Sequence, residues 1–171
     1  MDFQISHYED KNEADFIELF RKVFAEPPWN EHWSPVDIRR NIIRYNSEQV
    51  KAVSLVAVSN GNLIGFNSGH ELPVTGYEFL GNVIRRPTYF GFKLGVDPET
   101  KNGQPEYRGR GVGTALLKAK IALAKDEGFR QIVGRTKNLP KMRGIYEKLG
   151  YVEIGPKDPK DPLRVYFVKH L

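Results

Sequence analysis

The chain contains no cysteine. This absence excludes disulfide bonds, thiol catalysis, and zinc or iron–sulfur sites held by cysteine thiolates. The four histidines are scattered, and no His-Glu-x-x-His or similar spacing is present, so the sequence predicts no metal site. A chain without cysteine also fits a reducing compartment, and we expect a cytoplasmic protein.

Long apolar runs are absent as well. No run approaches the length of a membrane helix, and the polar stretch Met1–Asp10 lacks the pattern of a signal peptide, so we expect no membrane partner. The composition, with 40% hydrophobic and 27% charged residues, is ordinary for a globular protein. A length of 171 residues suits one core, and the sequence predicts a single domain over residues 1–171.

Negative charge is in the minority, since the net charge is +5 and basic residues are densest between Arg135 and Lys148. A basic balance is compatible with nucleic acid, an anionic membrane or an anionic cofactor. The dense stretch lacks the interleaved aromatic residues that stack on bases. A solvated helix face is the better interpretation, and we expect no nucleic-acid partner.

The most informative stretch is the glycine-rich segment Tyr107–Thr114, which runs directly into the helix-forming residues Ala115–Ala119. Glycine lets a backbone approach a bulky ligand and adopt positive φ. The start of a helix offers free N–H groups and a partial positive charge. The combination predicts a cradle for a phosphate or pyrophosphate. A tight turn that merely precedes a helix is the competing structural interpretation.

Two common phosphate-binding loops do not fit this segment. A P-loop needs Gly-Lys-Ser/Thr at the helix start, whereas Gly113 is followed by Thr114-Ala115 with no lysine before it. A dinucleotide fingerprint needs Gly-x-Gly-x-x-Gly directly after a strand. Here the spacing is Gly-x-Gly-x-Gly, and we expect a loop rather than a strand over Pro98–Pro105.

The order of predicted elements indicates an α/β fold of the α+β type. Helical spacing of apolar residues, with capping residues and glycine stops, predicts helices over Asn12–Ala25, Ser34–Asn46, Val112–Asp126 and Pro140–Leu149, the last capped by Asn138. Apolar and β-branched runs predict strands over Val53–Ser59, Leu63–His70, Thr88–Val96, Gln131–Thr136, Tyr151–Ile154 and Arg164–His170. We expect a hairpin turn at Asn60-Gly61, an irregular connection over Glu71–Arg86 and a surface loop over Glu99–Gln104.

Two motifs resemble those of the GNAT N-acetyltransferase superfamily. A predicted strand ending in Leu94-Gly95-Val96-Asp97-Pro98 precedes Glu106-Tyr107-Arg108-Gly109-Arg110-Gly111-Val112-Gly113, which is similar to the family's cofactor motif. A second motif of the family is similar to a later part of this chain, which contains Ile132-Val133, Asn138, Tyr146 and Leu149-Gly150-Tyr151. The extra residues Glu99–Gln104 depart from the family pattern. The resemblance implies the GNAT fold, which has a central mixed, mostly antiparallel sheet flanked by helices, with splayed central strands.

The resemblance also implies an activity, the transfer of an acetyl group from acetyl-CoA to an amine by direct attack. It implies cofactor contacts at Leu94, Gly95, Val96, Arg108, Gly109, Arg110, Gly111, Val112, Gly113, Thr114 and Asn138. Tyr146 matches the family's general acid for the CoA thiolate, although its spacing with Met142 and Leu149 is equally that of a core residue. The implied partner is a small-molecule or peptide amine, no metal is implied, and a homodimer is left open.

The general base has no single candidate. No acid lies within Thr88–Val96, where some family members keep one, so His70 and Glu71 are the first candidates, with Glu78 behind them. Exposed loop residues are an equally good interpretation of these positions, and a chain of water molecules can replace a single base.

The connection Glu26–Trp33 corresponds to a region that borders the acceptor site in the family. Its Trp29, Glu31 and Trp33 suit a cationic amine, since aromatic faces and carboxylates attract cations. The tryptophans are equally explained as anchors of the loop on the core. A non-catalytic acyl-CoA sensor of the same fold is the alternative function.

Overall fold

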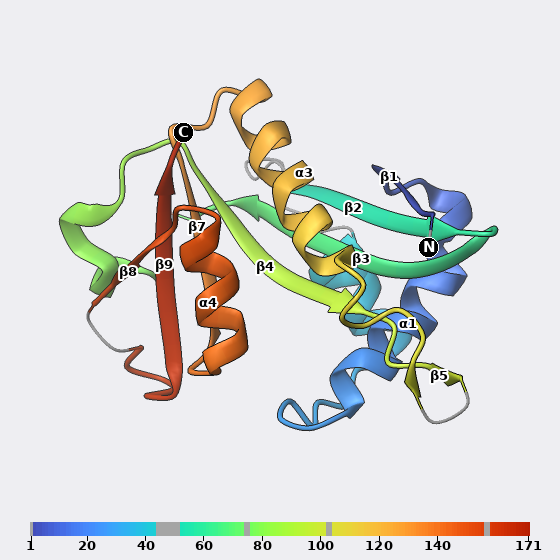
Figure 1. Cartoon of the computed structure of the whole chain (residues 1–171). Helices are drawn as coiled ribbons and strands as arrows, with labels where there is room; N and C mark the ends of the chain where they lie inside the picture. Colours follow the sequence, from blue (N-terminus) through green and yellow to red (C-terminus); the bar gives the residue numbers. More distant parts are fainter. Residues whose placement is uncertain (1, 44–51, 74–75, 102–103, 156–157) are drawn as a thin grey trace. The chain divides into compact units, whose positions relative to one another are not determined.

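The computed structural model of the chain describes residues 2–43, 52–73, 76–101, 104–155 and 158–171 (Figure 1). The chain folds as two compact units. Unit 1 comprises Met1–Gly69 and Lys93–Lys120, and unit 2 comprises His70–Phe92 and Ile121–Leu171. Strand β4 (Thr88–Val96) runs from unit 2 into unit 1.

The N-terminal elements of the chain belong to unit 1. They are β1 (Gln4–His7), α1 (Glu13–Ala25), α2 (Pro35–Ile38), β2 (Ala52–Ser59) and most of β3 (Asn62–Glu71). The second half of β4 follows, then β5 (Thr100–Lys101), β6 (Gln104–Pro105) and the first part of α3 (Val112–Asp126). β1 pairs antiparallel with β2, and β5 with β6 forms a separate small ladder.

Local sequence signals explain several of these boundaries. The Ser34 hydroxyl accepts a hydrogen bond from the N–H of Asp37 at 3.1 Å, which caps α2 as its sequence predicts. The helix continues as a π-helical turn over Arg39–Ile43, and the predicted end at Asn46 lies outside the described residues. Asn60 and Gly61 adopt φ of 49° and 79°, the conformation of the predicted hairpin turn between β2 and β3.

The core of unit 1 lies on both faces of its strands. Phe66 of β3 packs its ring against the α1 rings of Phe16, Phe20 and Phe24, at centroid distances of 4.9, 5.4 and 6.3 Å. A side chain on the neighbouring Gly65 would lie 3.1 Å or less from Val112 and Leu116 of α3. Because successive strand residues face opposite sides, α1 and α3 cover opposite faces of this part of the sheet.

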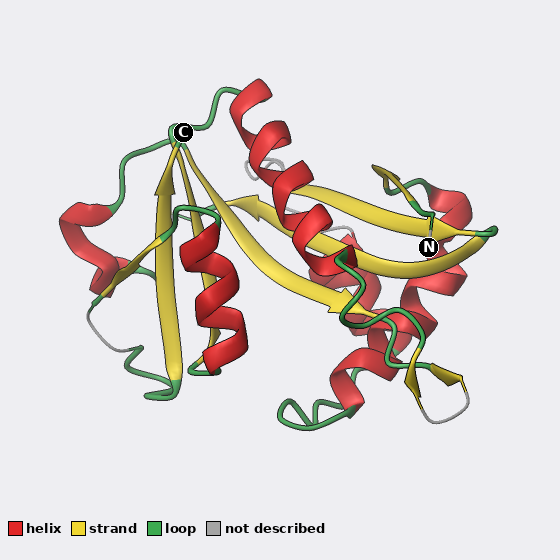
Figure 2. Cartoon of the chain, in the orientation of Figure 1, coloured by secondary structure: helices red, strands yellow, loops and turns green. Residues whose placement is uncertain are grey.

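The C-terminal elements of the chain belong to unit 2. They are the first half of β4, the end of α3, β7 (Gln131–Lys137), α4 (Pro140–Lys148), β8 (Val152–Ile154) and β9 (Arg164–His170). β4 pairs in parallel with β7 from Thr88–Gln131 to Gly91–Gly134. β9 pairs antiparallel with both β7 and β8. The helices and mostly antiparallel strands, shown in Figure 2, confirm the predicted α/β fold class.

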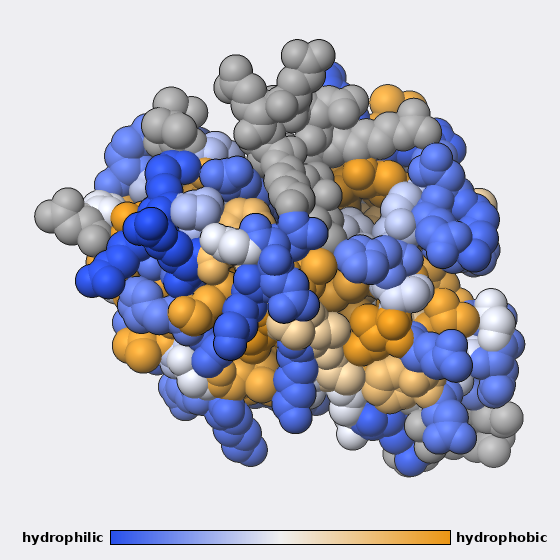
Figure 3. All heavy atoms as spheres, turned by 90° about the horizontal axis from the view of Figure 1, so that it is seen from above, coloured by the Kyte–Doolittle hydropathy of each residue, from blue (hydrophilic) through white to orange (hydrophobic). Residues whose placement is uncertain are grey.

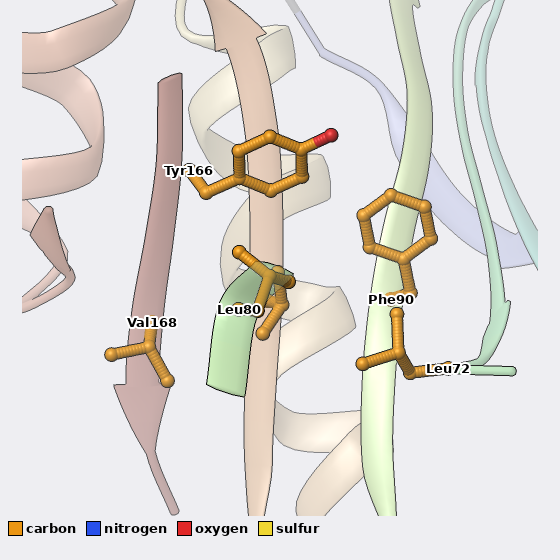
Figure 4. Packing of buried hydrophobic residues seen from close by; sticks show 6 residues of the cluster. Leu72, Leu80, Phe90, Tyr166 and Val168 are labelled. Atoms are coloured by element: carbon orange, nitrogen blue, oxygen red, sulfur yellow. The ribbon is translucent and has the colours of Figure 1, made fainter. Parts of the chain in front are cut away.

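The connection over Glu71–Arg86 is more ordered than the sequence predicts. It contains a 3₁₀ helix over Glu78–Val83, and Leu80 of that helix is buried against Phe90 and Val133. Figure 4 shows Leu80 with Leu72, Phe90, Tyr166 and Val168, which together with Val133 form an apolar cluster of unit 2. The Arg86 guanidinium donates hydrogen bonds to the carbonyl oxygens of Leu72 and Pro73, so the two ends of the connection are held together.

Two further sequence predictions are wrong. Leu139, rather than Asn138, occupies the N-cap of α4, because Pro140 takes the first helical position and the Asn138 side chain points forward to Arg143. The stretch Pro98–Pro105, expected as loop, contains the two short strands of the β5–β6 ladder. The sequence does not predict the range of β1. One of its four residues is half-buried and the other three are exposed, so the strand lacks an apolar pattern.

In the view of Figure 3, orange and light-orange atoms adjoin one another over the centre and right, and hydrophilic side chains border them. Among the residues that the structure describes, the most exposed large apolar side chains are Val36, Val152 and Leu163. Among the described helices, none has the length and apolar character needed to cross a bilayer.

Candidate active site

The glycine-rich loop of unit 1 has the backbone conformation that its sequence predicts. Gly109 and Gly111 adopt φ of 80° and 89°, in the left-handed region that favours glycine. Apart from the adjacent residues of the loop, no atom of the described residues lies within 4 Å of the position where a side chain on either glycine would begin. The loop therefore exposes its backbone to open space, as a backbone cradle for a bulky ligand must.

The loop leads directly into the first turn of α3. The first helical hydrogen bond runs from the N–H of Ala115 to the carbonyl of Gly111, at 2.9 Å. The N–H groups of Val112, Gly113 and Thr114 precede that bond and have no acceptor within the helix. A 15-residue helix adds the partial positive charge of its dipole at this end, which favours an anion.

Arg108 ties the start of the loop to the end of β4. Its Nε donates to the carbonyl oxygen of Val96 at 3.1 Å, and its Nη1 lies 2.7 Å from Oε2 of Glu26. Arg110, in contrast, is exposed. The two arginines of the motif thus differ, because one fixes the loop and the other faces solvent beside it.

The end of β4 is packed tightly on the core of unit 1. A side chain on Gly95 would lie 2.5 Å from Cζ of Phe66, so only glycine fits there. The flanking Leu94 and Val96 are half-buried. The three predicted cofactor-binding residues of this strand therefore sit on a rigid backbone, whose position is set by packing.

The inserted loop after β4 contacts both α1 and the residues that lead into the glycine loop, since the N–H of Glu106 donates to the carbonyl oxygen of Glu99 at 2.9 Å. Lys22 of α1 pairs with Asp97 at 2.8 Å and with Glu99 at 3.5 Å. These carboxylates line a cavity of about 340 Å³ together with Asp15, Glu18 and Tyr107, the first residue of the glycine-rich segment. Four carboxylates against one lysine disfavour a phosphate ligand, so the cavity is not the phosphate cradle.

The loop Glu26–Trp33 brings its three predicted acceptor residues onto α1 and β4. The indole N–H of Trp33 donates to Oε2 of Glu31 at 2.8 Å, and Nζ of Lys93 lies 2.7 Å from the same oxygen. The Trp29 ring packs edge-to-face on Phe24 at 5.8 Å. The predicted role of Trp29, Glu31 and Trp33 in acceptor binding stays a prediction, and the structure gives each a contact within unit 1.

Tyr146 of unit 2 is buried in a stack of aromatic rings. Its ring lies parallel to that of Phe167, 4.9 Å away, and edge-to-face with Tyr151 at 5.0 Å. A side chain on Gly134 of β7 would begin 2.7 Å from this ring, so glycine is required beneath it. Burial raises the pKa of Tyr146 to about 12, which keeps the phenol protonated at neutral pH.

The remaining predicted residues of unit 2 occupy different environments. Asn138 is exposed, and its Oδ1 accepts a hydrogen bond from Arg143 at 2.9 Å. His70 is buried with its Nδ1 2.7 Å from the carbonyl oxygen of Glu71, so Nδ1 carries the proton and donates. Burial and the nearby Arg135 lower the pKa of His70, although the Glu71 carbonyl opposes this, so the imidazole is neutral at pH 7. The Glu78 carboxylate instead accepts from the N–H of Gly76.

The chain matches the family described as "Acetyltransferase (GNAT) family" over residues 14–151. It belongs to this family. The match covers the GNAT cofactor motif and the Tyr146 motif together, so the predicted family and fold are confirmed. A comparison with curated protein sequences found no match.

Solved structures with the same fold include three acetyltransferases. The ribosomal-protein-S18-alanine N-acetyltransferase from Escherichia coli has a TM-score of 0.69 and 16% identity, with 99% of this chain and 94% of that chain covered. PaiA N-acetyltransferase from Thermoplasma acidophilum in complex with coenzyme A has a TM-score of 0.72 and 17% identity, with 100% of both chains covered. A GNAT family acetyltransferase from Brucella melitensis in complex with acetyl-CoA has values of 0.69 and 15%, with 99% and 88% covered. At these identities the similarity establishes the fold alone.

One residue of this GNAT chain stands out only in the structure. Lys93 is buried on β4, directly before the predicted cofactor residues Leu94–Val96. The sequence does contain a signal for this buried lysine, since Lys93 interrupts the otherwise apolar run Tyr89–Val96. Buried positions of this kind rarely hold a charged side chain without a partner. Its partner Glu31 lies 62 residues earlier in the chain, so the sequence alone does not reveal the pair.

Proposed function

We propose that the protein transfers an acetyl group from acetyl-CoA to a small-molecule or peptide amine. The observation that carries the proposal is the glycine loop, which has open space above two left-handed glycines and leads into the free N–H groups of α3. Family membership supplies the acyl donor. Only one of the three solved structures described above names its acceptor, the alanine of ribosomal protein S18, and at 16% identity that acceptor is not transferred to this chain.

The loop residues 108–114 would hold the pyrophosphate of CoA. The N–H groups from Gly109 to Thr114 and the dipole of α3 provide donors and a partial positive charge. The exposed Arg110 would add a full charge that pairs with a phosphate oxygen. Arg108 would act mainly by fixing the loop, because its Nε and Nη1 are engaged with Val96 and Glu26.

The acceptor amine must lose a proton before it attacks, because an alkylammonium group has a pKa of about 10. The neutral His70 imidazole is our first candidate for the base and Glu71 the second, either directly or through water. The amine nitrogen then forms a bond to the acetyl carbon, and the carbon–sulfur bond breaks. Backbone N–H groups at Leu94–Val96 would stabilise the negative charge on the carbonyl oxygen.

Tyr146 is proposed as the general acid for the CoA thiolate. Its pKa of about 12 keeps the proton on the phenol. Because a thiol has a pKa of about 8.5, complete transfer from this phenol is uphill, so a hydrogen bond to the developing thiolate comes first. Asn138 is proposed to contact the cofactor, as the family motif implies.

The proposal is tested in two steps. Acetyl-CoA should raise the unfolding temperature, since a ligand that binds only the folded state stabilises it by about 2.7 kcal/mol at a hundredfold excess over Kd. Thiol release is then measured across a panel of amines. The chain has no cysteine, so no protein thiol contributes to that signal. Binding without transfer to any amine would favour the sensor function, and failure to bind acetyl-CoA contradicts the proposal.

A further inference from the structure

Lys93 carries a buried ammonium group inside a cage of unit 1 side chains. The residue is 8% exposed. Its Nζ lies 2.7 Å from Oε2 of Glu31 and 4.2 Å from the centre of the Phe24 ring. The rings of Trp33 and Phe20 have their centres at 5.0 and 5.9 Å from the same nitrogen. One carboxylate and three aromatic rings thus surround one cation.

This arrangement is that of a binding site for an alkylammonium ion. An ammonium group without a partner is costly to bury, and a carboxylate at hydrogen-bond distance offsets that cost. The faces of Trp and Phe attract cations within about 6 Å of the ring centre. The Trp33 N–H also donates to the oxygen that Lys93 uses, which fixes the carboxylate. The cage is therefore built for a cation, and Lys93 supplies it from within the chain.

The cage includes Glu31 and Trp33, two of the residues predicted to receive a cationic acceptor. We propose that Lys93 is a specificity-determining residue, an internal ammonium that fills this cage and pairs with the Glu31 carboxylate. At this point the loop Glu26–Trp33 then presents aromatic rings and a carboxylate that already binds a cation. Amines without a second positive charge are preferred as acceptors over diamines and polyamines. The selectivity part of this inference rests on the proposed acetyl transfer, whereas the occupied cage does not.

The cage is tested by truncation and rescue. Lys93→Ala removes the atoms of n-propylammonium, so this ion should raise the unfolding temperature of Lys93→Ala in a saturable manner. The matched control Lys93→Met refills the space with an uncharged chain and should show no such rise, like the wild type. Adding Glu31→Gln to Lys93→Ala should abolish the effect. If n-propylammonium raised the unfolding temperature equally in all the variants, or not at all in Lys93→Ala, the cage would not be a cation site.

A second variant covers the case in which Lys93→Ala does not fold. The chain has no cysteine, so Lys93→Cys creates a unique thiol. Reaction with 2-bromoethylamine in denaturant rebuilds a side chain of lysine length with an ammonium group. The aminoethylated protein should refold and unfold near the wild-type temperature, whereas a neutral cap of the same length should not restore it. Equal restoration by both reagents would mean that only the volume matters, and would refute the role of the charge.

The selectivity is tested with an amine panel. We compare kcat/KM for a monoamine and a diamine of equal chain length in the wild type, Lys93→Met and Lys93→Met/Glu31→Gln. Lys93→Met removes the ammonium that pairs with Glu31, so the preference for the diamine should rise about 5- to 20-fold in this variant and fall back in the double variant. An unchanged ratio would overturn the selectivity. A wild type that binds acetyl-CoA but acetylates no amine would instead overturn the proposed acetyl transfer. The n-propylammonium experiment would still show whether the side chains around Lys93 bind a cation.

Discussion

At the scale of single residues, the structure requires glycine at different positions for two different physical reasons. Gly134 is required because the Tyr146 ring occupies the place of a side chain, and Gly95 because Phe66 does. Gly109 and Gly111 have open space around them and are required for their positive φ. Substitutions at these two kinds of position should therefore fail in different ways.

Tyr146→Phe tests the general acid. The variant keeps the ring that stacks on Phe167, so folding and acetyl-CoA affinity should remain close to wild type. Loss of the proton donor should lower kcat about 100-fold. The matched control is Tyr151→Phe, since the Tyr151 hydroxyl is buried without a hydrogen-bond partner among the described residues. Steady-state kinetics with equal kcat for both variants would remove Tyr146 from the mechanism.

Gly134→Ala tests the support beneath Tyr146. The new methyl group would begin 2.7 to 2.9 Å from the tyrosine ring, so the ring must move, and we expect about 1–3 kcal/mol lower unfolding free energy. Turnover should fall with it, while the control Gly144→Ala has no neighbour within 4 Å and should stabilise α4 by about 1 kcal/mol. Denaturant unfolding gives both values. A stable, fully active Gly134→Ala variant would show that the ring position is not critical.

At the scale of elements, the sequence predicts regular structure well where local signals agree. The ranges of β4 and α3 are Thr88–Val96 and Val112–Asp126, as predicted, because Asp97-Pro98 and Gly111 interrupt the pattern at clear points. Asn138 fails as a cap, because its side chain finds Arg143 instead, a contact that no local pattern encodes. The 3₁₀ helix over Glu78–Val83 is missed for a similar reason, since burial of Leu80 against β4 and β7 stabilises it.

The candidate site follows the same division. The glycine loop is predictable, because left-handed glycines and a helix start are local features. The contacts of Arg108 with Val96 and Glu26, and of Lys93 with Glu31, join residues far apart in the chain. Single-sequence patterns carry no information about such pairs.

Gly111→Ala tests the loop as an element. Alanine at φ of 89° is strained and should lower the unfolding free energy by about 1–2 kcal/mol. Because the loop backbone shifts, acetyl-CoA affinity should fall at least tenfold. Gly76→Ala is the matched control, since Gly76 has φ of 88° and equally open surroundings but lies outside the glycine loop. Calorimetric titration should find normal acetyl-CoA affinity in the control, and a similar loss in both variants would point to a general effect of destabilisation.

At the scale of the whole molecule, stability should depend on pH through Lys120. This residue of α3 is buried on the same helical face as Leu116, and burial lowers its pKa to about 7 from 10.5. Between these two values the unfolded chain binds the proton and the folded chain does not. The unfolding free energy should therefore rise with pH across this window, and the full penalty applies below about pH 7.

Lys120→Met removes the free-energy cost of burying this ammonium group. Unfolding free energy should increase by about 1–3 kcal/mol at pH 7, and the gain should shrink toward pH 10.5 as the wild type recovers. Urea unfolding at pH 6, 7, 8.5 and 10 measures the difference. Lys118→Met, an exposed neighbour on the same helix, is the control and should show no such window. A gain that stays constant with pH would assign the effect to packing alone.

The passage of β4 from one unit to the other has a consequence for how the protein can be divided. The chain changes unit after Gly69, after Phe92 and again after Lys120, so neither unit is a continuous segment. No single cut of the gene can express either unit alone, because a cut after Gly69 divides unit 1, a cut after Lys120 divides unit 2, and a cut after Phe92 divides both. A linear fragment that holds one whole unit also carries a piece of the other, so fragment complementation, or a chain rejoined across the excised piece, is needed to ask whether either unit folds by itself.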